Sequence, residues 1–507
     1  MLTQAIITIV TLIVTLICLI SAYQKSILRR LCCRELSGHP TVKKYFIIHI
    51  LPSSLKTPEK LHQDFRDIAI FMRRNHPNEK KVVIWVVPLV AVVLNFTADS
   101  VKPILKGSDK IYPKSILYRF VPFLKGSIIT ENGDDHRRAR KIMNPAFSRS
   151  SLEGFIDLFN RHSLKMVQDM STKNGQSGQE DTNLLDISNR LFLDIITDAA
   201  FGEEIGAIKN ASGNSIITAL DEIANYCRVV SQNPLMWSDF LLSSIFKSTK
   251  EKELFARKTY SEHIRKMIRR RLSDKENDEK DHNHNSLISL MLSGYKSGNL
   301  SESDIIQNCQ AFIFAGTETS ANTFACAGWV LARNPEMVLQ LRQELEENVP
   351  LFFLSKDDDQ KLKFEDTTKL PKLEAFIKET LRIYNPILIT SRTNPIANNL
   401  TLGTAVDIIM YDIIHKDPKF WGSDPYKFDL HRFLDDKNIE QNPFSYIPFS
   451  AGVRNCIGQH FAKLDLIVSL AYLLKYFDVS SEVSELDSIF EMTFKPKNAF
   501  VTFKVRK

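Results

Sequence analysis

The side chain with the clearest potential for chemistry is Cys456, in the segment PFSAGVRNCIGQHFAKLD (448–465). It stands between two glycines, and Arg454 precedes it by two positions. Apolar residues recur at helical intervals from Ile457 onward, so we expect Cys456 at the N-terminus of a helix. Free backbone N–H groups and the helix dipole lower a thiol pKa there and favour the thiolate. Such a sulfur can be a nucleophile, a metal ligand or neither.

Two of these roles need partners that the neighbouring sequence supplies poorly. A nucleophilic cysteine needs a base, and His460 lies one turn farther along the same helix, where it is badly placed to act on Cys456. A zinc half-site of the form C-x3-H needs a second pair of ligands, and none stands at a usable spacing. A structural cysteine flanked by glycines is the remaining alternative.

The residues around Cys456 fit the pattern F-x-x-G-x-R-x-C-x-G. In this the sequence resembles the haem-ligand loop of the cytochrome P-450 family. The resemblance implies that Cys456 is the axial thiolate of haem b iron, a ligation that favours O–O cleavage. It also implies that Gly452 permits the turn, Gly458 lets the helix approach the macrocycle, Arg454 binds a propionate and Phe449 packs beside the sulfur.

A second motif of the family is AGTETS at 315–320, which matches A/G-G-x-D/E-T-T/S. It stands in a helical segment predicted from about 303 to 333, ending at Asn334-Pro335. A glycine followed by a hydroxyl residue that bonds the preceding turn weakens a helix locally. The resemblance implies that this opening admits dioxygen and that Glu318 and Thr319 deliver protons to it.

A helix starting at Pro371 carries E-x-x-R, formed by Glu379 and Arg382. In the family these residues meet an arginine from a P-x-R-F segment. Here PYKFDLHRF supplies Arg432, and Leu430 takes the place of the usual proline. We therefore predict a buried triad of Glu379, Arg382 and Arg432 with a structural role.

Further cationic residues resemble the family's propionate ligands. GDDHRRARKIMNPAF resembles the W-x-x-x-R helix, with Arg140 as a ligand and His136 in place of tryptophan, and Arg392 resembles another ligand. A basic surface for an acidic electron donor is predicted from residues near these motifs, a merely solvated face being the alternative. These residues are Arg137, Arg138, Lys141 and Lys463.

The first 24 residues carry no charged side chain, and as a helix they reach roughly 36 Å, enough to cross a bilayer. A cleaved signal peptide is the alternative. Basic residues follow at once, so residues 25–55 form a basic juxtamembrane linker and the rest of the chain faces the cytosol. Seven cysteines without repeated spacing agree with a reducing compartment. We expect a single-pass protein of the endoplasmic reticulum membrane.

Residues 56–507 are expected to form one domain, mainly α with a smaller β region, in the cytochrome P-450 fold. Residues 81–94 predict paired strands, and the polar stretches 171–183 and 273–286 predict surface loops. The net charge of +7 is too small for this length to indicate nucleic acid binding. Hydrophobic residues make up 44% of the chain, which is typical of a globular protein and excludes disorder as the main state.

The resemblance implies a monooxygenase that inserts one atom of O2 into a lipophilic terpenoid, steroid, fatty acid or polyketide. The chain has no nicotinamide or flavin fingerprint, so electrons are expected from NADPH through a membrane-bound reductase. The segments are similar to microsomal eukaryotic members, and fungal ones among them, where secondary metabolism is common. The alternatives are a haem-thiolate isomerase or dehydratase, and a non-catalytic haem-binding membrane protein.

Overall fold

The computed structural model describes residues 60–506, except for positions 77, 88–89, 178–180, 210–214, 233–246, 274–285, 396–403, 435–440 and 491. The predicted membrane anchor (1–24) and basic linker (25–55) lie outside the described residues. None of the helices that are described is long and apolar enough to cross a membrane.

The described chain is mainly helical with a smaller β region, as predicted. Its helices are α3 (Lys60–Asn75), α4 (Ala98–Lys106), α5 (Gly133–Met143), α6 (Arg149–Ser177), α7 (Leu184–Phe201), α8 (Ser215–Gln232), α10 (Lys247–Ser273), α11 (Leu287–Lys296), α12 (Glu302–Arg333), α13 (Pro335–Asn348), α14 (Pro350–Phe353), α15 (Phe364–Thr367), α16 (Pro371–Ile383), α17 (Tyr411–Ile414), α18 (Pro418–Trp421) and α20 (Gln459–Tyr476).

The strands form small sheets at the side and end of the helical body. They are β1 (Lys81–Val87), β2 (Val90–Asn95), β3 (Thr182–Asn183), β4 (Ile389–Thr393), β5 (Thr404–Met410), β6 (Phe477–Ser480), β7 (Ser488–Phe490), β8 (Phe494–Pro496) and β9 (Phe500–Val505). The sheet orders are β1-β2-β5-β4, β3-β9-β6 and β7-β8.

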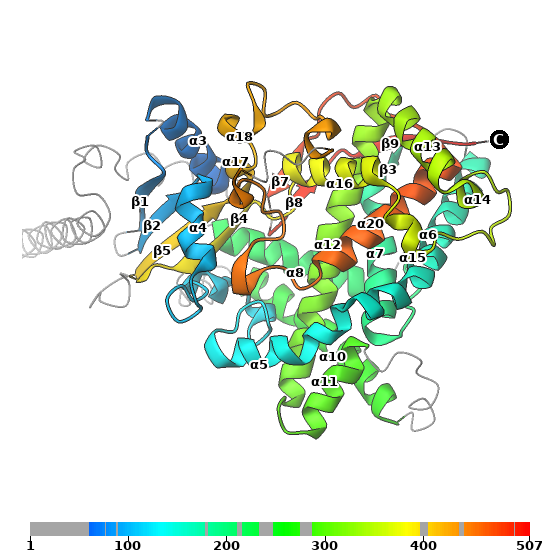
Figure 1. The fold of residues 1–507 in the computed structure, drawn as a ribbon. Coiled ribbons are helices and arrows are strands. Elements are labelled where there is room, and N and C mark those ends of the chain that lie inside the picture. The colour runs from blue at the N-terminus through cyan, green and yellow to red at the C-terminus, as the bar shows by residue number, and fades with distance from the viewer. Residues whose placement is uncertain are drawn as a thin grey trace, which may run out of the picture.

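The four-stranded sheet lies with α3 on one side of the molecule, and the helices form the larger part on the other side (Figure 1). Its strands β1 and β2 are the predicted pair, antiparallel from Lys81 opposite Asn95. Strand β5 then runs parallel to β2 and antiparallel to β4. Because β-branched residues fill these strands, one sheet face packs on α3 through Phe65, Val92 and Val406.

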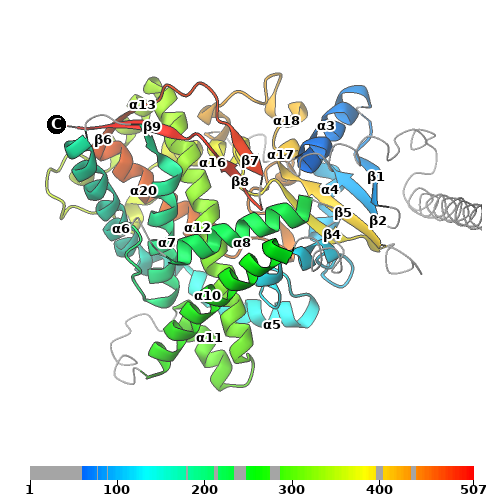
Figure 2. The same ribbon diagram turned by 180° about the vertical axis from the view of Figure 1, so that it is seen from behind.

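Helix α12 runs through the middle of the helical body (Figures 1 and 2). It begins with a capping box between Ser301 and Asp304. It ends before Pro335, and this end is the one that the sequence predicted. Most of its residues are buried, because apolar side chains occupy every face. Gly316 lets α7 approach closely, since a Cβ at this position would lie 2.7 Å from the side chain of Ile196.

One loop prediction is wrong in part. Residues 171–177, expected in a surface loop, continue α6 to Ser177. The hydroxyls of Ser171 and Thr172 donate to the carbonyl oxygens of Val167 and Gln168, four residues earlier, and so follow the helix. The earlier part of α6 is held by its buried residues, so the helix can continue into a polar segment. Polar residues do not prevent the backbone hydrogen bonds of a helix from forming.

Candidate active site

Cys456 lies between the short 3-10 turn Gly452–Arg454 and helix α20, two residues ahead of the N-cap Gly458. This confirms the predicted helix N-terminus. The backbone N–H of Cys456 donates to the carbonyl oxygen of Phe449 at 2.8 Å, which closes the loop on itself. The residue is exposed although α20 behind it is largely buried. An accessible sulfur on a closed loop is available as a ligand.

The two glycines of the motif differ in what the protein requires of them. Gly452 has a φ of 72°, and a Cβ there would lie 1.9 Å from the carbonyl oxygen of Leu105. The turn therefore needs glycine both for its backbone angle and for contact with α4. A Cβ at Gly458 would meet only Phe147, at 3.8 Å, which is ordinary contact. The protein alone does not demand glycine at 458.

The environment of Cys456 contains opposing influences on its thiol. Although residue Cys456 is exposed, desolvation by the surrounding protein raises the pKa of its thiol, whereas the backbone N–H of Gly458 and the cation of Arg140 lower it. The net direction is upward, so the prediction that the helix N-terminus favours the thiolate is wrong for the protein by itself. A coordinated metal cation deprotonates a thiol outright. The sulfur thus fits a metal ligand better than a free nucleophile.

Arg140 on α5 contacts the cysteine loop directly. Its Nη1 donates to the carbonyl oxygen of Asn455 at 2.6 Å, and its Nη2 donates to the Asn455 Oδ1 at 2.7 Å. Its Nε donates to Asn144 on the following turn. The predicted ligand residue therefore holds the residue next to Cys456, and its role toward a propionate stays a prediction.

Arg454 and His136 share a partner that the sequence analysis missed. Arg454 Nε donates to Asp109 Oδ1 at 2.8 Å, and His136 Nδ1 lies 3.2 Å from Asp109 Oδ2. Arg454 also donates to the carbonyl oxygen of Glu131 and to Asn132 Oδ1. Burial and the Arg454 cation lower the pKa of His136 to about 4, despite Asp109, so its ring is neutral near pH 7.

Arg392 on β4 is buried and forms part of a cationic cluster with Lys114, Tyr118 and Arg454. Lys114 Nζ donates to the Tyr118 hydroxyl at 2.9 Å. Burial and the cations of Arg392 and Arg454 lower the pKa of Lys114 to about 8, although Tyr118 opposes this. Burial alone would raise the pKa of Tyr118, but Lys114 and Arg392 lower it to about 7. Such a cluster favours an anion.

The donors around Cys456 fit haem. Cys456 is exposed on a closed loop, and the nearby cationic cluster would bind carboxylates. A Cβ at Gly458 would meet little protein, so packing within the protein does not explain the glycine, which leaves space beside the loop. Cys456 would hold the iron, with Lys114 and Arg392 toward the propionates. Neither Lys114 nor Tyr118 stands in a recognisable motif, so the sequence alone gave no signal for them.

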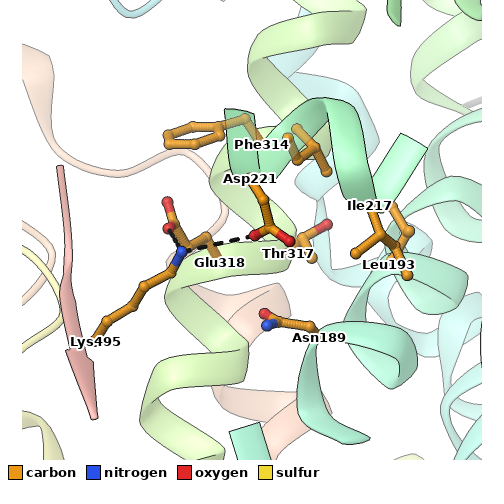
Figure 3. A pocket seen from close by; sticks show the side chains of 9 residues that line it. Asn189, Leu193, Ile217, Asp221, Phe314, Thr317, Glu318 and Lys495 are labelled. Carbon is orange, nitrogen blue, oxygen red and sulfur yellow. Dashed lines mark ion pairs between the residues drawn. The ribbon is translucent and has the colours of Figure 1, made fainter. Parts of the chain in front are cut away.

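The predicted catalytic pair of α12 occupies adjacent positions with separate contacts. Thr319 Oγ1 donates to the Ala315 carbonyl oxygen at 2.7 Å, which is the predicted bond to the preceding turn. Helix α12 nevertheless continues without interruption here. Glu318 faces a small cavity where its Oε1 lies 3.2 Å from Lys495 Nζ (Figure 3). The two side chains therefore have different partners at neighbouring positions of one helix.

The contacts of the predicted structural triad are confirmed, and Arg432 is less buried than the other two residues. Arg382 and Glu379 form two hydrogen bonds, of 2.6 and 2.8 Å, and both side chains are fully buried. Arg432 Nε lies 3.6 Å from Glu379 Oε1. Arg382 also donates to carbonyl oxygens of the segment that leads to the cysteine loop, at His415 and Pro425. The triad thus joins α16 to that segment.

The predicted basic surface is partly neutralised by its own helix. Arg137 pairs with Asp134, and Arg138 Nη2 lies 2.9 Å from Asp135 Oδ1, all exposed. Lys463 Nζ lies 5.8 Å from the ring centroid of Phe449. Exposed pairs at this spacing add little stability, and their cations remain accessible to a partner. Docking of an electron donor on this surface stays a prediction.

Comparison with known proteins agrees with this site. The cytochrome P-450 family model matches residues 59–503. Cytochrome P-450 4V2 of Mus musculus is 29% identical over 440 residues, which cover 82% of this chain and 80% of that protein. Cytochrome P-450 4F11 of Homo sapiens is 29% identical over 417 residues, covering 78% and 77%.

A third relative is leukotriene-B4 omega-hydroxylase 3 of Mus musculus, which is 27% identical over 412 residues, covering 78% of this chain and 76% of that protein. The family model spans nearly all of the described residues, including Cys456 and its loop. The chain therefore belongs to the cytochrome P-450 family, and it is a haem-thiolate monooxygenase.

Proposed function

We propose that this monooxygenase hydroxylates a fatty-acid-like substrate with electrons from an NADPH-dependent reductase, at the cytosolic face of the endoplasmic reticulum membrane. The reaction is RH + O2 + two electrons + two protons to ROH + water. The observation that carries the proposal is the exposed Cys456 on its closed loop, held by Arg140 through Asn455.

Thiolate-ligated haem supplies the activation of O2 when bound. The chain's residues prepare its surroundings. Arg140 fixes the position of Asn455 beside Cys456, and Gly452 allows α4 to support the same loop. Lys114 and Arg392 provide positive charge for carboxylates. The sulfur and the anion-binding groups are thus held by separate elements, which limits their relative movement.

Glu318 and Thr319 are proposed to move protons at the place where the haem would activate O2. The Thr319 hydroxyl is held by Ala315, so its oxygen has a fixed direction with lone pairs left to accept a proton or water. Glu318, at the preceding position, is a carboxylate beside a cavity. A carboxylate near a hydroxyl can relay protons through water by general acid catalysis.

The substrate class is supported by one relative whose printed name is leukotriene-B4 omega-hydroxylase 3. Among the predicted classes this favours the fatty acids over terpenoids, steroids and polyketides. A role in secondary metabolism stays a prediction from the sequence resemblance. Dodecanoic acid is a suitable first probe because it presents a carboxylate and a plain alkyl chain.

The first test is a carbon monoxide difference spectrum of reduced membranes that contain the full chain. A strongly red-shifted Soret band should be present, be lost in Cys456→Ala, and be retained in Cys326→Ala, whose thiol is buried elsewhere in α12. Haem binding without that band in the unchanged chain would refute thiolate ligation at Cys456.

The second test reconstitutes the chain with an NADPH-dependent reductase and dodecanoic acid. NADPH-dependent formation of hydroxydodecanoic acid would support the proposal, and Thr319→Ala should keep the haem band while less of the NADPH consumed appears as product. Conversion of a lipid hydroperoxide without reductase would favour the isomerase or dehydratase alternative. NADPH consumption no faster than with reductase alone would favour the binding-protein alternative.

A further inference from the structure

A small cavity beside α12 contains charged groups from elements far apart in the sequence. Glu318 comes from α12, Asp221 from α8 and Lys495 from the hairpin strand β8 (Figure 3). Helix α7 adds the uncharged Asn189, and Thr317 of α12 also lines the cavity. The remaining lining residues are apolar. The cavity therefore joins the acid of the oxygen-activation motif to a cation and a second carboxylate.

Lys495 lies between the two acids. Its Nζ is 3.2 Å from Glu318 Oε1 and 3.8 Å from Asp221 Oδ1. The side chain of Lys495 is 16% exposed and that of Glu318 is 9% exposed, whereas Asp221 is 64% exposed. The contact with Glu318 is shorter and less screened by water, so it is the stronger of the two.

The cavity has the size and lining of a site for water. Its volume is about 30 Å³, and roughly 10–15 Å³ of such space admits one water molecule. The Thr317 side chain is 95% buried, since the residue is 5% exposed, and its Oγ1 finds no hydrogen-bond partner among the described residues. A buried hydroxyl normally has a partner, so a water in the cavity is the natural one.

We propose that Lys495 is a positioning residue that holds the Glu318 carboxylate at this water cavity, and that Asp221 of α8 shares the lysine. This inference rests on the proposed role of Glu318 in proton delivery. Protons from solvent would reach Glu318 through the cavity water. Because Asp221 is on α8, a shift of that helix would change how firmly Lys495 holds Glu318.

The step at issue is the fate of two electrons and two protons taken up with O2. Productive turnover gives ROH and water from RH, whereas O2 with two electrons and two protons alone gives hydrogen peroxide. The electrons come from NADPH through the reductase in both cases. Poor proton delivery allows peroxide release before the O–O bond breaks, so the ratio of peroxide formed to NADPH consumed reports on the proton supply.

The test measures this ratio for the full chain with reductase, with dodecanoic acid and without it. Lys495→Met should raise the ratio about threefold or more, as expected when contacting charged groups in a partly buried site are separated. Glu318→Gln should raise it similarly, and the double variant should show no further increase. Lys495→Arg keeps the positive charge and should give the same ratio as the unchanged chain. Lys497→Met is the matched control, since Lys497 pairs with Asp487 and should leave the ratio unchanged.

Each variant is first checked for an intact carbon monoxide band, and urea unfolding of the same proteins provides a second readout. The double-variant cycle for Lys495 and Glu318 should show a coupling of about threefold in the unfolding equilibrium constant. Coupling in unfolding without a change in peroxide release would overturn the proposal and leave Lys495 a structural role. An unchanged ratio in Glu318→Gln would overturn both this inference and the proposed proton role.

Failure of the proposed substrate is distinguishable from failure of this inference. If dodecanoic acid yields no hydroxylated product, the fatty-acid proposal is refuted, whereas the peroxide ratio without added substrate still decides the role of Lys495. A ratio that rises equally in Lys495→Met and Lys497→Met would show a general effect of charge loss and would refute the positioning role.

Discussion

Replacing Arg382 by methionine should destabilise the whole protein rather than its chemistry alone. Arg382 is fully buried, donates two hydrogen bonds to Glu379, and donates to the carbonyl oxygens of His415, Pro425 and Lys427. Methionine fills similar space and makes none of these bonds. Among the described residues, Glu379 would keep the backbone N–H of Asp429 at 2.8 Å and Arg432 Nε at 3.6 Å.

The expected loss is about 3–5 kcal/mol in the free energy of unfolding, because one partner of a buried ion pair is left without its counter-charge. The pair itself adds less than this, since burying both ions is costly. The double variant Glu379→Gln, Arg382→Met removes the uncompensated charge. It should therefore recover at least about 1 kcal/mol of the loss.

The loss should also depend on pH. Burial raises the pKa of Glu379, and Arg382 is the main group that opposes this. Without Arg382 the folded protein binds a proton at Glu379 more tightly than the unfolded chain does, so stability falls as pH rises from the unfolded pKa through the folded one. The deficit of Arg382→Met should be smaller at pH 5 than at pH 8.

Urea unfolding of the holoprotein, followed by circular dichroism at both pH values, measures these changes. Lys378→Met is a suitable control, because Lys378 lies on the same helix and pairs with Glu374, which is more exposed. The reasoning is refuted if Arg382→Met loses less than about 1 kcal/mol, or if the double variant is no more stable than the single one.

Three further predictions concern backbone and charge. Gly452→Ala should abolish the carbon monoxide band, because its Cβ would collide with Leu105. Gly298 has the same φ of 72°, but no atom lies within 4 Å of a Cβ built there. Gly298→Ala should therefore cost only about 1–2 kcal/mol in the free energy of unfolding. Gly458→Ala should leave unfolding by urea unchanged but lower haem content per protein, because its Cβ meets little protein; equal haem content would contradict this. Burial raises the pKa of Asp407 to about 6 from 3.8, so the folded protein holds this proton more tightly and loses about 2–3 kcal/mol of stability as pH rises between these values. Asp407→Asn should remove that part of the pH dependence of unfolding, as measured in urea between pH 4 and 7.

Features set by short stretches of sequence were predictable. The helix ending at Asn334 and the helix start at Pro371 follow from local signals, and the structure has both. The triad of Glu379 with Arg382 was predictable because two members stand on one helix face. In each case the interacting residues, or the family motif that contains them, lie close together in the chain.

Features made by distant segments were not predictable from local patterns. Asp109 contacts both His136 and Arg454 although it lies in a loop with no motif. Lys495 reaches Glu318 only because β8 packs beside α12. The pKa of Cys456 was predicted in the wrong direction because a helix N-terminus is visible in sequence, whereas desolvation depends on everything packed around the thiol.

The geometry of the cysteine loop is fixed by the protein before any ligand acts on it. The Cys456 N–H bonds Phe449, Arg140 holds both oxygens of Asn455, and Gly452 abuts Leu105. These contacts come from the loop itself, α5 and α4, so loss of one leaves the others in place. Desolvation raises the pKa of the Cys456 thiol. On a mobile loop such a thiol would be a poor ligand, because each coordination event would require both deprotonation of the thiol and ordering of the loop. Ordering the loop in advance leaves only the deprotonation, which the metal cation itself favours.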